Sequence, residues 1–280
     1  MGYGAALLLL GVAVISLWVW CQCASGSTSS SHSLQRHLAV APEARLNLVF
    51  GLWEAWDPQA PPESLAHAWA RWTPWCETHH WSLHTWNRKE CEDLVKDVSD
   101  QVPAVSDLWD VYQNLPRPVQ RADVARLAVV WQHGGWYFDV DVEPRPKLES
   151  LMARTPSTDL FFVEHTMPAH WPQEAAKRYA IRRGRSERRE RLANFAFYAP
   201  PKSAVVLRIL EELTRRCREN PDVHEDYDVL YTTGPDCLTE VVQGLRDHGE
   251  VPVTVVPHRP YLKHRCDGSW RRNRDLALDT

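Results

Sequence analysis

The stretch Arg121–Pro144, RADVARLAVVWQHGGWYFDVDVEP, carries the most informative pattern in this chain. Apolar residues in its first half recur every three or four positions, which predicts a helix over Arg121–Gln132 with one apolar face. That face comprises Val124, Leu127, Ala128 and Trp131. Gly134 can adopt the left-handed conformation that ends a helix, and a short strand, Trp136–Val142, is expected after it.

The unusual feature of this predicted strand is that it carries carboxylates among apolar residues. Side chains alternate across a strand. One side receives Trp136, Phe138, Val140 and Val142, and the other receives Tyr137, Asp139 and Asp141. A phenol and two carboxylates thus share one face near the carboxyl end of the strand, where open α/β sheets bind ligands. On the preceding helix, Asp123 and Arg126 are three residues apart and therefore neighbours on another part of its surface.

Two carboxylates on one face repel each other unless a cation lies between them or one of them takes a proton. Carboxylate oxygens suit Mg²⁺ or Mn²⁺, and Mg²⁺ often shares its coordination with substrate phosphates. We therefore expect a divalent cation that joins Asp139 and Asp141 to a diphosphate ligand. The alternative is a capped strand end or a solvated turn, because a bare Asp-x-Asp is short and common. The helix, the glycine pair and the aromatic strand around it favour the metal.

The composition is that of a globular protein, with 280 residues, 44% hydrophobic and 24% charged. The formal net charge of −4 gives no basic field for a nucleic acid. Before the quoted stretch, the pattern predicts strand, helix, strand, helix, which is typical of a parallel α/β arrangement. These elements are a strand at Leu46–Trp53, a helix from Glu63 that ends near Pro74, a strand at His79–Asn87 and a helix at Glu90–Val98.

The N-terminal segment is apolar and carries no charged side chain before Arg36. Tyr3–Cys23 is long enough to span a bilayer, so residues 1–24 are expected to be a transmembrane signal anchor, with a cleaved signal peptide as the alternative. Residues 25–40, rich in serine, read as a flexible stem. This layout predicts a single-pass type II protein of the Golgi or ER membrane with a lumenal domain, or a secreted protein if the segment is cleaved.

The quoted stretch resembles the signature of DXD-type glycosyltransferases, in particular the yeast-type initiating α-1,6-mannosyltransferases and the sphingolipid mannosyltransferases. Large clostridial glucosylating toxins are more distant relatives. The family pattern is an Asp, an Arg three residues on, a Gly-Gly pair, and then Tyr-x-Asp-x-Asp. It is matched here by Asp123, Arg126, Gly134, Gly135, Tyr137, Asp139 and Asp141.

Weaker similarities to the same family follow in order along the chain. LVFGLW (Leu48–Trp53) resembles a first strand ending in Trp, although Phe50 stands where the family often has His. Three later segments resemble the family's Asn-strand-helix, Thr-Gly-Pro and His…Gly-Ser-Trp segments. They are NFAFYAPPKSAVVLRILEEL (Asn194–Leu213), TTGPDCLTEVV (Thr232–Val242) and HRCDGSW (His264–Trp270).

The resemblance implies an α/β fold of the GT-A type, a single domain with a central mostly parallel sheet over residues 41–280. Within it, residues 151–192 are expected to be a variable insertion on the acceptor side. The implied metal ligands, for Mn²⁺ or Mg²⁺, are Asp139, Asp141 and His264. The implied donor-binding residues are Trp53, Asp123, Arg126, Tyr137, Asp139, Asn194, Ser269 and Trp270. Catalytic roles are implied for Asp123, Arg126, Asp139 and Asp141.

The implied activity is retaining transfer of a hexose from a GDP- or UDP-linked donor to a glycan or glycolipid acceptor. Mannose, galactose, glucose and N-acetylglucosamine are all compatible with the motifs. The sequence also leaves open whether retention proceeds by same-face attack or through a covalent intermediate. The alternative is a catalytically inactive GT-A module that binds a nucleotide sugar or a glycan. The presence together of Asp123, Arg126, Asp139, Asp141 and His264 favours the enzyme.

Overall fold

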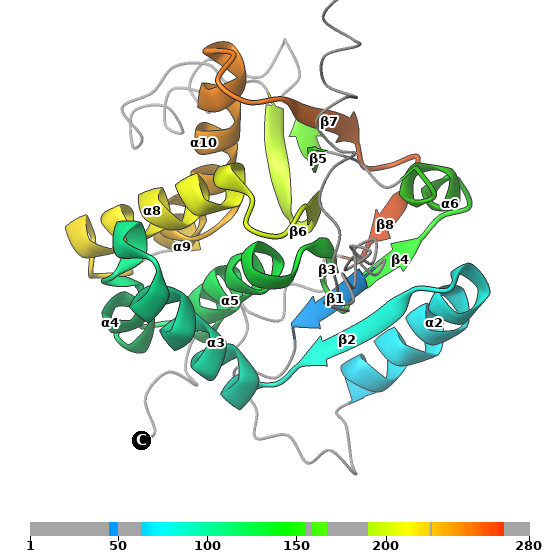
Figure 1. The fold of residues 1–280 in the computed structure, drawn as a ribbon, viewed down its shortest axis with the longest axis horizontal. Coiled ribbons are helices and arrows are strands. Elements are labelled where there is room, and N and C mark those ends of the chain that lie inside the picture. The colour runs from blue at the N-terminus through cyan, green and yellow to red at the C-terminus, as the bar shows by residue number, and fades with distance from the viewer. Residues whose placement is uncertain (1–44, 50–62, 155–157, 167–189, 225, 266–280) are drawn as a thin grey trace, which may run out of the picture. The chain divides into compact units, whose positions relative to one another are not determined.

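A computed structural model describes residues 45–49, 63–154, 158–166, 190–224 and 226–265. Its centre is a six-stranded sheet with the order β2-β1-β3-β6-β5-β7 (Figure 1). The strands are β1 (Arg45–Val49), β2 (Ser82–Trp86), β3 (Gly135–Phe138), β5 (Asp159–Thr166), β6 (Glu190–Ala199) and β7 (Val253–Pro257). The pairs β1–β2, β1–β3 and β5–β7 are parallel, whereas β6 runs antiparallel to both of its neighbours. The expected mostly parallel sheet is confirmed.

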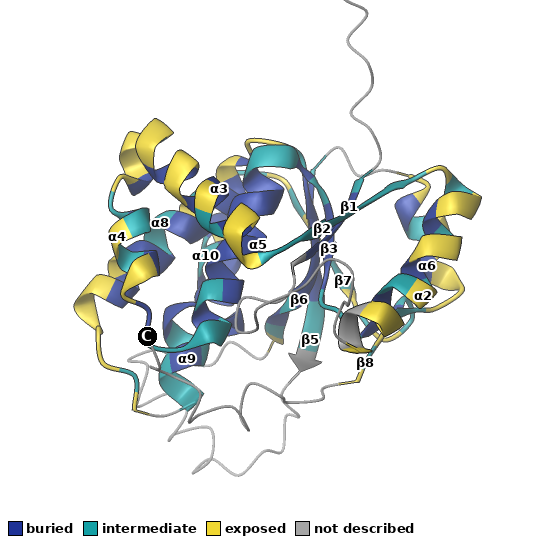
Figure 2. Cartoon of the chain, turned by 90° about the horizontal axis from the view of Figure 1, so that it is seen from below, coloured by how far each residue is buried: buried dark blue, intermediate teal, exposed yellow. Residues whose placement is uncertain are grey.

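Helices cover both faces of the sheet, as Figure 2 shows. One face carries α3 (Arg88–Gln101), α4 (Leu108–Gln113), α5 (Pro118–His133), α8 (Ala204–Glu219), α9 (Asp226–Thr232) and α10 (Pro235–Asp247), with a short 3₁₀ turn at Pro103–Val105. The other face carries α2 (Glu63–His79) and α6 (Lys147–Met152). A second, two-stranded sheet pairs β4 (Val142–Pro144) with β8 (Leu262–His264) in antiparallel fashion.

The predicted alternation in the quoted stretch is confirmed by the two hydrophobic cores. Trp136, Phe138 and Val142 are buried in the core on the α2 side, and Val140 packs against that core. Tyr137 instead belongs to the core on the α5 side. The apolar residues therefore fix which side of the sheet receives the phenol, because a one-residue slip in register would exchange the two sets.

The prediction of one continuous strand over Trp136–Val142 was wrong. Strand β3 ends at Phe138, and the chain then turns, with the Val142 amide donating to the Asp139 carbonyl at 3.0 Å. Val142 begins β4 in the second sheet. Asp139 and Asp141 therefore lie in a turn between two strands, where the backbone can bend both carboxylates toward a common centre.

The helix predicted to end near Pro74 continues to His79. A proline inside a helix removes one backbone hydrogen bond, here the bond to the carbonyl of Ala70. Ala70 is exposed, so water can satisfy that carbonyl. Trp72 and Cys76 on either side of the proline are buried, and their burial offsets the cost.

Helix α5 is buried on every side along Ala122–Trp131, not only on the predicted apolar face. Asp123 and Arg126 are therefore interior groups, which corrects their expected place on the helix surface. The helix ends as predicted at a glycine with positive φ, Gly134 at 69°, and Gly135 follows with a φ of 99°. A Cβ on Gly135 would lie 2.5 Å from the carbonyl oxygen of Arg45, so the close approach of β3 to β1 requires glycine there.

Several expectations fall wholly or partly outside the described residues. The anchor at 1–24 and the stem at 25–40 do so entirely, and within the described part no helix is long and apolar enough to cross a membrane. Of the predicted insertion at 151–192, residues 159–166 form strand β5 of the central sheet. Four cysteines lie in the described ranges, and all are buried and unpaired: Cys76, Cys91, Cys217 and Cys237.

Candidate active site

Three predicted metal ligands come together beside the turn that follows β3. Each of Asp139, Asp141 and His264 offers one ligand atom, and these atoms lie within 4.8 Å of one another. The side chains are 26%, 21% and 16% exposed, so a ligand from solvent can reach them. Two carboxylates and an imidazole form a donor set that fits Mn²⁺ and accepts Mg²⁺ less readily, because Mg²⁺ prefers oxygen.

The pairing of β4 with β8 brings His264 back to the two aspartates. Val142 and His264 are partners in the register of that sheet, which places the end of the described chain opposite the turn. The imidazole Nε2 lies 3.3 Å from Asp141 Oδ1. The ring stacks on Phe195 of β6 at a centroid distance of 3.9 Å, and this contact fixes its orientation.

A buried arginine lies between two of the predicted carboxylates. The Arg126 guanidinium reaches Asp123 Oδ1 at 3.2 Å and Asp139 Oδ1 at 3.3 Å. The same guanidinium lies 5.2 Å from the centre of the Tyr137 ring, and the Tyr137 hydroxyl donates to Asp139 Oδ1 at 2.5 Å. Helix α5 and strand β3 are thus joined through polar groups at the predicted donor site.

Asp123 is held by three side chains, one from its own helix, one from β6 and one from the turn between α9 and α10. Its Oδ1 accepts from Asn194 Nδ2 of β6 at 2.9 Å and from Arg126, and its Oδ2 accepts from the Thr233 hydroxyl at 2.8 Å. A carboxylate has about four acceptor positions, so these contacts leave about one for a ligand. Asn194 also accepts from Arg126 through its backbone carbonyl at 2.9 Å, so it supports both members of the pair.

Burial and shared charge shift the pKa values in this cluster. Burial raises the pKa of Asp123 to about 7, against the opposing effects of Arg126 and Thr233. Burial likewise raises the pKa of Asp139, and Asp141 adds to this effect through like-charge repulsion. The pKa of Tyr137 lies well above its usual value because of burial, so the phenol stays neutral. For Arg126, burial acts against the charge, but Asp139, Tyr137 and Asp123 outweigh it and raise the pKa.

His264 also has a raised pKa. Burial lowers that pKa, but the hydrogen bond to Asp141 and the charges of Asp141 and Asp139 outweigh burial. Without a metal, the imidazole is therefore protonated more readily than usual. A histidine ligates a metal in its neutral form, so a cation bound here would displace a proton and would bind more weakly at low pH.

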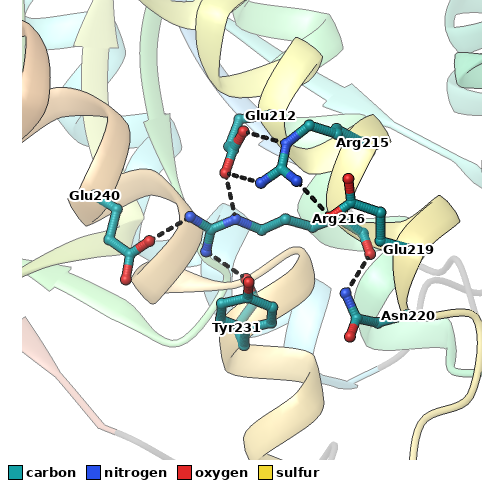
Figure 3. A network of polar contacts seen from close by, with 7 residues as sticks. All are labelled: Glu212, Arg215, Arg216, Glu219, Asn220, Tyr231 and Glu240. Atoms are coloured by element: carbon teal, nitrogen blue, oxygen red, sulfur yellow. Dashed lines mark hydrogen bonds and ion pairs between the residues drawn. The ribbon is translucent and has the colours of Figure 1, made fainter. Parts of the chain in front are cut away.

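Figure 3 shows a polar network around the buried Arg216 of α8, which reaches α9 and α10, the helices on either side of Thr233. Arg216 donates through Nε to Glu212 at 2.7 Å, through Nη1 to the Tyr231 carbonyl at 2.9 Å, and through Nη2 to Glu240. These bonds tie α8 to the end of α9 and to α10. Next along the chain, Thr232 accepts from the Gln120 amide of α5 at 3.1 Å.

The structure thus brings seven of the predicted site residues into one connected region. They are Asp123, Arg126, Tyr137, Asp139, Asp141, Asn194 and His264. Trp53, Ser269 and Trp270 lie outside the described residues. Thr233 was missed as a site residue. The Thr-Gly-Pro turn was the available signal, but sequence alone does not show that the turn reaches α5.

Comparison with known proteins relates part of this site to a described family. Residues 59–158 match the model of the family described as "Glycosyltransferase sugar-binding region containing DXD motif". The matched range holds Asp123, Arg126, Tyr137, Asp139 and Asp141. The enzyme class expected from the sequence, a glycosyltransferase, is confirmed by this match.

The solved structures that are similar to the chain include two glycosyltransferases. The first is titled "PaToxG Glycosyltransferase", with 11% identity, a TM-score of 0.41, and coverage of 72% of this chain and 69% of that chain. The second is the ligand-free glycosyltransferase domain from the YGT toxin, with 9% identity and a TM-score of 0.36. That likeness covers 66% of this chain and 54% of the toxin domain, so the chain spans about half of it. No curated protein sequence matches the chain.

Proposed function

We propose that this protein is a metal-dependent, retaining glycosyltransferase that moves a hexose from a nucleoside diphosphate sugar to a glycan or glycolipid. The observation that carries the proposal is the group formed by Asp139, Asp141 and His264, whose ligand atoms lie within 4.8 Å of one another. A bound Mn²⁺ would neutralise the charge that builds on the diphosphate leaving group. The bond between the anomeric carbon and that group breaks, a bond to the oxygen of an acceptor hydroxyl forms with retained configuration, and the hydroxyl proton leaves with the diphosphate.

The buried pair beside the metal ligands is suited to hold the donor sugar. Arg126 stays charged between Asp123 and Asp139, so a fixed guanidinium holds both carboxylates in place. Asp123 has about one acceptor position left, which fits a single sugar hydroxyl. Since Asn194 already donates to Asp123, we expect it to affect the donor through that carboxylate. Fixed polar groups of this kind need little rearrangement during the reaction.

The test uses the purified full chain and four donors: GDP-mannose, UDP-galactose, UDP-glucose and UDP-N-acetylglucosamine. Each is incubated with Mn²⁺, with Mg²⁺ or with EDTA, and released nucleoside diphosphate is measured. We expect release from one donor in Mn²⁺ and none in EDTA, and no release by Asp141→Asn. NMR of the product anomer reports retention. Release that EDTA leaves unchanged would contradict the metal dependence, and folded protein inactive with every donor would contradict the donor class.

We also propose that the protein works in the lumen of the Golgi or ER, held by its N-terminal segment. The support is the uncharged apolar run Tyr3–Cys23 followed by a serine-rich stretch. Protease protection of a C-terminally tagged chain in sealed microsomes tests this proposal. A tag that protease removes without detergent would contradict it.

A further inference from the structure

One side chain from a distant helix bonds to the backbone between the two aspartates. Arg71 of α2 donates through Nη2 to the carbonyl oxygen of Val140 at 2.5 Å. Val140 is the residue between Asp139 and Asp141. Arg71 lies outside every motif that the sequence singled out, and 69 positions separate it from Val140.

The other backbone bonds of this turn leave the Val140 carbonyl to Arg71. The Asp139 amide donates to the Phe195 carbonyl of β6 at 2.8 Å, and the Asp139 carbonyl accepts from the Val142 amide. The Asp141 carbonyl accepts from the Arg265 amide at 3.2 Å. Within the described ranges, Arg71 is thus the one side chain that holds a carbonyl of residues 139–141. Without the Arg71 side chain, the Val140 carbonyl loses this hydrogen-bond donor.

Helix α2 is itself fixed against the start of the turn. Trp72, the neighbour of Arg71, stacks on Phe138 with ring centroids 4.7 Å apart and planes 7° apart. Both rings are fully buried, and Phe138 directly precedes Asp139. The ring stack therefore holds Phe138, just before Asp139, and the Arg71 hydrogen bond holds Val140, just after it.

Burial of the Arg71 side chain costs free energy. Its Nε is buried and has no hydrogen-bond partner in the described part of the structure. Unpaired buried donors are rare in folded proteins because they give up hydrogen bonds to water. A short aliphatic side chain would avoid this cost, but it could not reach the Val140 carbonyl.

We infer that Arg71 is a positioning residue, which holds the Asp139–Asp141 turn in the shape that presents both carboxylates to one cation. The inference rests on the proposed metal-dependent function. The role is one of geometry, because Arg126 is the cation that contacts Asp139. Outer groups that orient metal ligands typically change metal affinity about 10–100-fold when removed. We expect the lower end, about tenfold, because other bonds to the turn remain.

The experiment measures Mn²⁺ binding directly, by the EPR signal of free Mn²⁺, on the full chain without any donor. Arg71→Met removes the donor group and keeps the length of the side chain, and Arg71→Lys keeps the charge and one kind of donor. Arg88→Met removes an exposed arginine of α3 and serves as the matched control. Asp141→Asn defines the loss of a ligand. Circular dichroism shows that each variant is folded.

We expect wild type and Arg88→Met to bind equally, Arg71→Met to bind about tenfold more weakly, and Arg71→Lys to lie between them. Equal binding by wild type and Arg71→Met would overturn the inference and leave the proposed function intact. So would a folded Arg71→Lys variant as weak as Arg71→Met, or an Arg71→Met defect seen only in nucleotide binding. Absence of Mn²⁺ binding by the wild type would instead overturn the proposed function, and this inference with it.

Discussion

Replacing Asp123 with Asn is expected to stabilise the protein at alkaline pH while it removes activity. Asp123 is buried, and burial raises its pKa from 3.8 to about 7. The folded protein therefore keeps this proton to a higher pH than the unfolded chain does. Its stabilising contribution is complete below about pH 4 and is lost as pH rises through about 7. Asn carries no charge at any pH, so the variant has no such loss.

The size of the effect follows from the pKa shift. A change from 3.8 to about 7 is about 3 units, and each unit corresponds to about 1.4 kcal/mol, which gives about 4 kcal/mol. Loss of the ion pair to Arg126 in the variant acts in the opposite direction at high pH. We therefore expect the free energy of unfolding of the variant, relative to that of wild type, to rise by about 2–4 kcal/mol from pH 4 to pH 8.

Urea unfolding at one-unit steps from pH 4 to pH 8 measures this change as a shift in midpoint. The matched control is Asp93→Asn, an exposed change on α3 that gives the baseline for the removal of a surface carboxylate. A difference between Asp123→Asn and wild type that stays constant across this range, or that falls as pH rises, would contradict a raised pKa at Asp123. Donor turnover by the same variant should be lost at every pH.

Three further changes test other parts of the site. Thr233→Val removes the hydroxyl that donates to Asp123 at 2.8 Å, and should cut kcat/KM about 10–100-fold and move its acid limb to higher pH, with Thr233→Ser as the restoring variant; an unchanged pH profile would contradict this. Gly135→Ala puts a Cβ 2.5 Å from the Arg45 carbonyl oxygen at positive φ and should lower the free energy of unfolding by about 1–3 kcal/mol. Urea unfolding measures this loss, and equal midpoints for the variant and wild type would contradict it. His264→Gln should weaken Mn²⁺ binding and flatten its dependence on pH between about 5 and 8, as titrations by EPR would report.

The local pattern was enough to predict much of the fold. Alternation along Trp136–Val142 correctly separated the apolar residues from Tyr137, because burial on both sides of the sheet fixes the register. It did not predict that the strand ends at Phe138. That break depends on a turn closed by Val142 and on the pairing of β4 with β8, which is remote in sequence.

Site residues within a sequence motif could be predicted, whereas their burial and their contacts with distant segments could not. The spacing singled out Asp123 and Arg126 but did not predict their burial, because that burial depends on the packing of α3 and α8 against α5. Thr233 lies in a quoted motif, yet only the fold shows that it reaches Asp123. Arg71 belongs to a helix that the pattern ended three residues later, at a proline that packing overrides.

Calorimetric titration of GDP and UDP into the full chain, in Mn²⁺ and in EDTA, tests most directly whether a metal joins the protein to the donor. We predict that one nucleotide binds at least about tenfold more tightly with Mn²⁺, a difference of about 1.4 kcal/mol, and that Asp141→Asn loses this gain. Equal affinity in Mn²⁺ and EDTA would contradict it, because Asp139, Asp141 and His264 would then not join a cation to the diphosphate.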